Sequence, residues 1–133
     1  MIILKHAIKI SAPRSTVYIA LTDPEAMRRW HIGTIEGTLL PGQVLTLTSA
    51  SGKRFGWRTE KLEADSFIVQ TGVEGMGTSV GKTLTFNLSD LDEGRTLVEL
   101  ADGEWSERDP HLPFCNTHWG RALHNLKTYL EKS

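Results

Sequence analysis

The chain has 133 residues, a length expected for one domain, and its 39% hydrophobic and 23% charged residues are typical of a globular protein. Its single cysteine excludes a framework of intrachain disulfides. The 15 basic and 16 acidic residues leave a net charge of −1, so no overall positive field would attract nucleic acid or an anionic membrane. We therefore expect one domain, residues 1–133, with neither of these partners.

The N-terminal segment also bears on where the protein is found. Lys5, His6 and Lys9 interrupt its apolar residues, which makes residues 1–10 too polar for the core of a signal peptide. No other stretch has the length and hydrophobicity of a membrane span. These features indicate a cytoplasmic protein.

Residues 4–10 alternate between apolar and polar positions, which predicts a half-buried strand. The positions on its buried side are Leu4, His6, Ile8 and Ile10. The strand is expected to end at Ser11, because proline at position 13 suits the first turn of a helix.

Two short helices are predicted after this strand. Ser11 or Ala12 is expected to cap the first. Asp23-Pro24-Glu25 repeats the start signal, with an aspartate cap and an acidic first turn, and predicts a second helix that runs to about Trp30.

Residues 33–103 have the pattern of short strands separated by turns, with Pro-Gly, Ser-Gly and Asp-Glu-Gly punctuation. Each strand has one mainly apolar side, which predicts an antiparallel sheet with one buried and one wet face. The positions assigned to the apolar side are Phe55, Trp57, Thr59, Phe67, Val69, Thr71, Leu84, Phe86, Leu88, Val98 and Leu100.

The last segment, residues 113–131, predicts a long helix of about nineteen residues, or roughly 28 Å. Its apolar residues recur at intervals of three and four. They are Cys115, Trp119, Ala122, Leu123, Leu126 and Leu130. The element order predicts an α+β fold in which the helices cover one face of the sheet.

A glycine-rich segment, residues 75–83, resembles a phosphate-binding loop because it ends in Gly-Lys-Thr. The motif requires glycine where Met76 stands, and it requires a helix after Thr83, where the pattern predicts a strand. We interpret the segment as a loop near the mouth of a pocket.

His111, Cys115 and His118 are spaced as metal ligands on one helix face would be, with Glu104, Glu107 or Asp109 as a fourth ligand. Pro113 argues against one continuous helix, and the spacing matches no established zinc motif. Cys115 and His118 could also form a nucleophile and base, but a lone cysteine is usually buried and inert. We therefore expect no metal, no cofactor and no catalytic residue from this group.

Four tryptophans, Trp30, Trp57, Trp105 and Trp119, come from four different parts of the chain. They can fill an ordinary core, since aromatic residues bury a large area. They can also line a cavity beneath the long helix, which is the usual form of a site for a small apolar ligand. The sequence pattern leaves both interpretations open.

Several phrases resemble the SRPBCC or START-like superfamily with its helix-grip fold, and its bacterial branch related to the activator of heat-shock protein 90 ATPase. They are Ile8-Lys9-Ile10-Ser11-Ala12-Pro13, Ala20-Leu21-Thr22-Asp23-Pro24-Glu25 and Trp119-Gly120 followed by Leu123 and Leu126. The resemblance implies about seven antiparallel strands curved around the C-terminal helix, with a hydrophobic cavity between them. Members include lipid carriers, polyketide cyclases and co-chaperones.

Our first hypothesis is binding of a small apolar or aromatic ligand in this cavity. The residues expected to line it are Trp30, Phe55, Trp57, Phe67, Phe86, Trp105, His118, Trp119 and Leu123. One alternative is a cyclase or aromatase that moves protons with His118 and Glu104. Another is a co-chaperone type of interaction module, which the polar outer sheet face disfavours. The chain is expected to be a monomer or a homodimer.

Overall fold

The computed structural model describes residues 1–75 and 78–132 and contains one seven-stranded antiparallel sheet with the strand order β1-β7-β6-β5-β4-β3-β2. The elements are β1 Ile2–Ile10, α1 Arg14–Thr22, α2 Pro24–Trp30, β2 Thr34–Gly37, β3 Val44–Thr48, β4 Arg54–Glu63, β5 Phe67–Glu74, β6 Thr83–Asp90, β7 Thr96–Trp105 and α3 Leu112–Glu131. This confirms the predicted α+β helix-grip fold, including the two short helices after the first strand.

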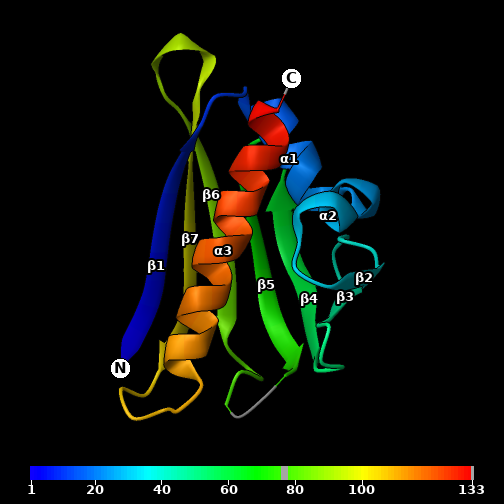
Figure 1. Ribbon diagram of the computed structural model, residues 1–133, viewed down its shortest axis with the longest axis vertical. Coiled ribbons are helices and arrows are strands. Elements are labelled where there is room, and N and C mark those ends of the chain that lie inside the picture. Colours follow the sequence, from blue (N-terminus) through cyan, green and yellow to red (C-terminus); the bar gives the residue numbers. More distant parts are fainter. Residues whose placement is uncertain (76–77, 133) are drawn as a thin grey trace.

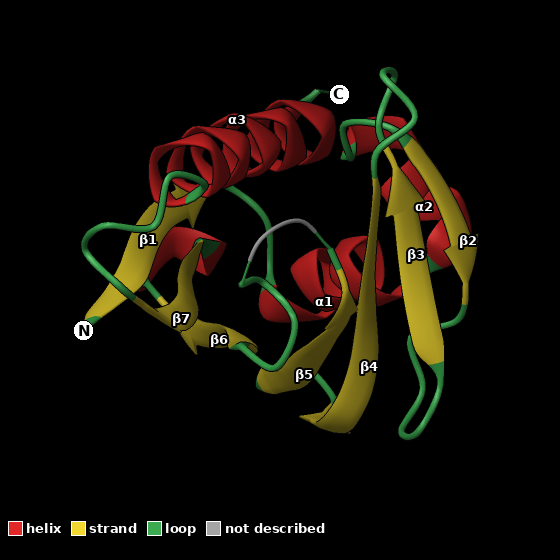
Figure 2. Cartoon of the chain, turned by 90° about the horizontal axis from the view of Figure 1, so that it is seen from below, coloured by secondary structure: helices red, strands yellow, loops and turns green. Residues whose placement is uncertain are grey.

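The sheet curves around α3, as Figure 1 and Figure 2 show. Seen from below in Figure 2, the strands form a trough, and α3 lies across its open side. α1 and α2 occupy one end of the trough, near the C-terminal end of α3 (Figure 1). Among the described residues, no helix lies at the other end of the trough, next to the start of α3.

One of the two short helices begins at the predicted cap, and the other begins later than predicted. Asp23 caps α2 by accepting a hydrogen bond from the backbone N–H of Glu25 at 3.4 Å, as predicted. The prediction that Ser11 or Ala12 caps α1 was wrong, because Pro13 is the N-cap, with extended backbone angles. The ψ angle of Pro13 is 158°, so the proline is not the first helical residue, and the helix starts at Arg14.

The structure also corrects the predicted inner face of β5. Ile68 pairs with Phe86 and Gln70 with Leu84, and directly paired residues share a face of the sheet. Ile68 and Gln70 therefore point toward α3, and Phe67 points to the outer face. This strand carries apolar residues on both sides, so alternation alone could not distinguish the two faces.

The densest core lies where α1 and α3 meet the sheet. Val17, Val98 and Leu126 are fully buried there. Thr96, also fully buried, donates its hydroxyl hydrogen to the carbonyl of Ala12 at 2.7 Å and so leaves no unpaired group. These contacts fix the C-terminal half of α3 on the sheet and leave its first half to border an opening.

Candidate ligand-binding cavity

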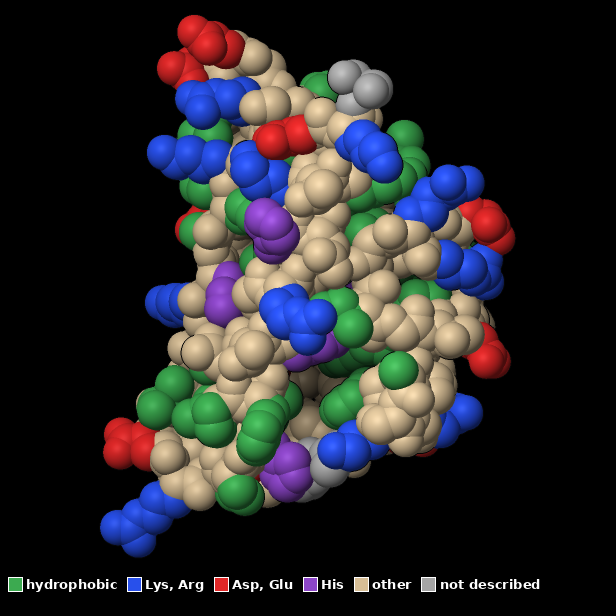
Figure 3. Space-filling view, in the orientation of Figure 1, with side chains coloured by type: hydrophobic (Ala, Val, Ile, Leu, Met, Phe, Trp, Pro, Cys, Tyr) green, Lys and Arg blue, Asp and Glu red, His purple; other side chains and the backbone are tan. Residues whose placement is uncertain are grey.

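A cavity of about 310 Å³ lies between the first half of α3 and the ends of β4 to β7. The space-filling view in Figure 3, which has the orientation of Figure 1, is hollowed in its lower part. The aromatic residues that line it are Phe55, Trp57, Trp105, Phe114 and Trp119. Polar side chains at its edges are Lys53, Glu74, Ser79, Lys82, Asp102, His111, Cys115 and His118.

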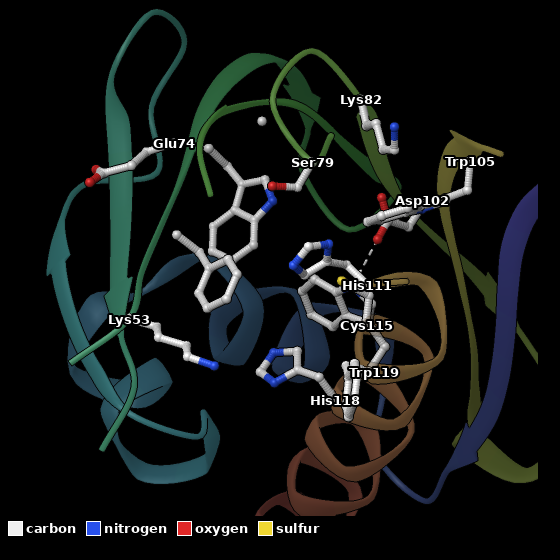
Figure 4. Close-up of a pocket in the computed structure, with 14 residues that line it drawn as sticks. Lys53, Glu74, Ser79, Lys82, Asp102, Trp105, His111, Cys115, His118 and Trp119 are labelled. Carbon is white, nitrogen blue, oxygen red and sulfur yellow. Dashed lines mark hydrogen bonds between the residues drawn. The ribbon is translucent and has the colours of Figure 1, made fainter. Parts of the chain in front are cut away.

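α3 supplies one wall because its helical repeat places every third or fourth residue on the same side. Cys115, His118 and Trp119 lie on this face, and Figure 4 shows them turned toward the cavity. His111 is the N-cap residue, outside the helix proper, and Pro113 lies in the first turn. The N-terminal end of α3 therefore lies at the mouth of the cavity.

β7 supplies the opposite wall through an irregularity in its pairing with β1. Leu4 pairs with Asp102, whereas Ile2 pairs with Trp105, so β7 has one more residue than β1 between these two pairs. Such a bulge reverses the alternation of side chains. As a result Asp102 and Trp105, which regular alternation would place on opposite faces, both line the cavity.

Trp119 is the central contact between the two walls. It is only 3% exposed, and its indole N–H donates to Asp102 Oδ2 at 3.2 Å. Its ring lies edge-on to Phe86, with 6.0 Å between the centroids, and also 6.0 Å from Trp57. Burial raises the pKa of the Asp102 carboxyl, and the hydrogen bond from Trp119 partly opposes this.

Two histidines form a neutral pair beside Trp119. The rings of His31 and His118 are stacked with 6.1 Å between their centroids, and His31 also stacks on Trp30 at 4.5 Å. Burial, with a smaller contribution from His118, lowers the pKa of His31 to about 3. Burial and the charge of Arg121 also lower the pKa of His118. Both imidazoles are thus uncharged at neutral pH and suit an apolar surrounding.

Cys115 is half-buried in the same wall. Burial, together with the negative charges of Asp102 and Asp109, raises the pKa of its thiol to about 11. Because the thiolate is the nucleophile, this thiol is poorly activated at neutral pH. At neutral pH Cys115 is therefore an uncharged thiol in the cavity wall.

The structure brings five of the nine expected lining residues together at the cavity: Phe55, Trp57, Trp105, His118 and Trp119. Trp30 and Phe86 instead border a separate void of about 20 Å³, behind Trp57 and Trp119. Leu123 packs in the core, one turn beyond the cavity. Phe67, on the outer face, and Glu104, which is exposed, do not line it.

The polar residues on the sheet side of the cavity, above all Lys82 and Asp102, were not predicted from the sequence. The alternation of side chains along a strand could have identified them. Asp102 follows Val98 and Leu100 at intervals of two, and Lys82 precedes Leu84 at the same interval. Both residues lie on the inner sides that the alternation correctly predicted for these two strands. Because the inner side was assigned from apolar residues, the charged Lys82 and Asp102 were not included in it.

The glycine-rich segment contributes Ser79 and Lys82 to the cavity edge. Thr83 begins β6, so a strand follows the Gly-Lys-Thr sequence, as predicted. Met76 and Gly77, which fall in the predicted loop, lie outside the described residues. Within residues 1–75 and 78–132, no three His, Cys, Asp or Glu side chains are grouped to hold a metal ion.

In the described part of the chain, no helix combines the length and hydrophobicity needed to cross a membrane.

Comparisons with known proteins agree with this geometry. The chain is similar to the Aha1 dimer from Colwellia psychrerythraea, with 26% identity, a TM-score of 0.89, and 99% of this chain and 98% of that chain covered. It is also similar in fold to protein SSP2350 from Staphylococcus saprophyticus, with 22% identity, a TM-score of 0.80 and coverage of 98% and 92%.

A third similar structure is PFC0360w, an HSP90 activator from Plasmodium falciparum, with 18% identity, a TM-score of 0.80 and coverage of 98% and 96%. No curated protein matches the sequence. The model of the family described as "Activator of Hsp90 ATPase homolog 1-like protein" matches residues 11–131, which is nearly the whole chain. The chain therefore belongs to this family.

Proposed function

We propose that the chain binds a small apolar or aromatic molecule in the cavity between α3 and β4 to β7. The observation that carries this proposal is a cavity of about 310 Å³ with aromatic walls and a few polar groups at its edge. Volumes from about 300 Å³ upward and this mixture of surfaces are typical of small-molecule sites. Filling such a cavity with an apolar ligand removes aromatic surface from water, which favours binding.

The charge state of the walls supports the same conclusion. His31 and His118 have lowered pKa values and add no charge beside Trp119 at neutral pH. The ring of Trp119 is in contact with the rings of Trp57, Phe86 and the two histidines. The Asp102 carboxylate beside it already accepts a hydrogen bond from the indole, so the uncharged rings offer an apolar ligand a surface whose burial costs little.

Native mass spectrometry of freshly purified protein, followed by thermal-shift measurements with fatty acids, sterols and aromatic polyketides, tests the proposal. A ligand at about a hundred times its dissociation constant should stabilise the fold by roughly 2.7 kcal/mol. The same spectra distinguish a monomer from a homodimer, the form solved for the relative from Colwellia psychrerythraea.

Cavity-filling variants make the test specific. Cys115→Phe places an aromatic ring in the cavity without removing a side-chain hydrogen bond, and it should abolish the thermal shift. Asn116→Phe adds the same ring at the next, exposed position and should keep the shift. If the wild type retains no small molecule and no compound shifts its melting temperature, the proposal is wrong.

A further inference from the structure

Two side chains of opposite charge, Lys82 and Asp102, border the same end of the cavity (Figure 4). Leu84 pairs with Asp102 across β6 and β7, and Lys82 precedes Leu84 by two residues, so strand alternation brings Lys82 and Asp102 to one face. Among the described residues, neither takes part in an ion pair within 4.0 Å. They therefore do not neutralise each other by direct contact.

Each of these groups is held in place by one wall of the cavity. Lys82 Nζ donates to Thr78 Oγ1 at 3.3 Å and lies 4.5 Å from the centre of the Trp105 ring. Asp102 accepts from Trp119 Nε1 at 3.2 Å. An ammonium has three hydrogens to donate and a carboxylate has about four acceptor positions, so both retain capacity for a ligand.

The remaining surface favours a flat ring. Phe55 and Trp57 lie nearly parallel, with 6.4 Å between their centroids and 18° between their planes, and Trp119 contacts Trp57 with 6.0 Å between the centroids. Aromatic rings pack well against such offset surfaces. A ligand ring in contact with them would bring one edge toward Lys82 and Asp102.

The charges of Lys82 and Asp102 also limit which polar group the ligand ring can carry on the edge that faces them. A ligand carboxylate would be attracted by Lys82 and repelled by Asp102, and a ligand ammonium would experience the reverse. A hydroxyl can donate to the Asp102 carboxylate and accept from the Lys82 ammonium at the same time. It is the small polar group that satisfies both residues without bringing a charge into the cavity.

We propose, on the basis of the ligand-binding function above, that the cavity selects aromatic molecules with a ring hydroxyl, which bridges Asp102 and Lys82. The partial burial of Asp102 strengthens the preference, because a carboxylate that has already lost water gains more from a new donor. The apolar walls supply affinity, and the two charged groups supply selectivity for the hydroxyl.

Three compounds with the same two-ring body test this selection: 2-naphthol, 2-methylnaphthalene and 2-naphthoate. Titrations followed by NMR can use the indole N–H signals of Trp105 and Trp119, which place binding in the cavity. We expect 2-naphthol to bind about tenfold more tightly than 2-methylnaphthalene, as a hydrogen bond to charged groups allows. It should also bind more tightly than 2-naphthoate.

Variants of the two charged residues should remove the preference. Lys82→Met keeps the length of the side chain and Asp102→Asn keeps an oxygen for Trp119, and each should lower the naphthol preference by at least about threefold. In Lys82→Met, the affinity for 2-methylnaphthalene should fall less than the affinity for 2-naphthol, because only the naphthol loses a hydrogen bond. Lys61→Met, an exposed position beside Phe67 that does not line the cavity, is the matched control and should keep the full preference.

The outcomes separate this proposal from the one on which it rests. Equal binding of 2-naphthol and 2-methylnaphthalene would overturn hydroxyl selection while supporting an apolar cavity. Tightest binding of 2-naphthoate would also overturn it and would assign an anion site to Lys82. Binding of none of the three, together with no retained ligand and no thermal shift, would instead contradict the proposed function.

Discussion

The two ends of the space between α3 and the sheet are closed in different ways. At the end near Leu126, aliphatic side chains from α1, α3 and the sheet interlock, and Val17, Val98 and Leu126 have no exposed surface. At the end near Cys115, large aromatic rings and charged side chains meet around about 310 Å³ of space. One helix on one sheet thus forms a packed core and a cavity side by side.

The difference follows from the side chains and from what lies between the layers. α1 and α2 lie at the first end, as Figure 1 shows, and contribute buried apolar residues such as Val17 and Met27, whereas loops flank the second. Val17, Val98 and Leu126 are fully buried at the first end, whereas Trp57 and Trp119, whose planes meet at 53°, border open space at the second. The packed end should therefore carry the stability of the fold, and the open end its ligand chemistry.

The largest expected effect is on stability at the packed end. Leu126→Ala leaves a void that its close-packed neighbours cannot fill, and we expect it to lower the free energy of unfolding by about 2–5 kcal/mol. Cys115→Ala, on the same helix beside existing space, should lower it by less than about 1 kcal/mol. Urea unfolding of both variants measures the contrast. Similar losses at the two positions would show that the cavity end is as tightly packed as the core.

The packed end was also the part of the molecule that the sequence predicted best. Apolar residues at intervals of three and four placed Leu123 and Leu126 on the buried face of a helix predicted over 113–131, which the structure has at Leu112–Glu131. Asp23-Pro24 located the start of α2 in the same way. Local sequence patterns can predict the buried face where all of its residues are apolar, because hydrophobicity alone then distinguishes it from the exposed face.

The cavity end was predicted only in part, for reasons that involve contacts between distant segments. Trp105 and Asp102 share a face only because of the bulge opposite Ile2 to Leu4, which no local pattern in β7 announces. Gln70 faces inward although it is polar, and Phe67 faces outward although it is apolar. Both facts depend on the register with β6, which sequence alternation does not determine.

Two tryptophans sharpen the comparison between the ends, because each is 3% exposed and each donates one indole hydrogen bond. Trp30 Nε1 donates to the Ala20 carbonyl at 2.8 Å in the packed region, and Trp119 Nε1 donates to Asp102 at 3.2 Å beside the cavity. Trp30→Phe should cost about 1–3 kcal/mol, since it leaves a buried carbonyl unpaired.

Trp119→Phe should cost less than Trp30→Phe, because water in the cavity can hydrate the Asp102 carboxylate when the indole is lost. Thermal and urea unfolding of the two variants measure the difference. A larger loss for Trp119→Phe would mean that the hydrogen bond between α3 and β7 is shielded from water and contributes to the core.

The pH dependence of stability tests the neutral histidines at the boundary between the two ends. The pKa of His31 is about 3 in the folded protein and about 6.5 when unfolded. Between these values the unfolded chain binds the proton more readily, so stability falls as the pH decreases below about 6.5. The slope from His31 is at most about 1.4 kcal/mol per pH unit, and His118 adds to it in the same direction.

Unfolding measured from pH 7.5 to 4.5 checks this sign. His31→Gln should flatten the curve in this range, and His124→Gln, at an exposed position of α3, should reproduce the wild-type slope. A curve that stays flat as the wild type is acidified would show that His31 gains a proton in the folded state. The stacked pair would then be charged and could not form part of an apolar wall.

The smallest effect on stability is expected at the mouth, where Phe114 is 74% exposed yet lines the cavity. Phe114→Ala removes little buried surface, so the free energy of unfolding should change by less than about 0.5 kcal/mol. A bound ring would cover this side chain, so affinity for 2-naphthol should fall about threefold to tenfold. Phe114→Leu should recover part of the loss. Reduced stability with unchanged affinity would assign Phe114 to the core and exclude it from the ligand's path.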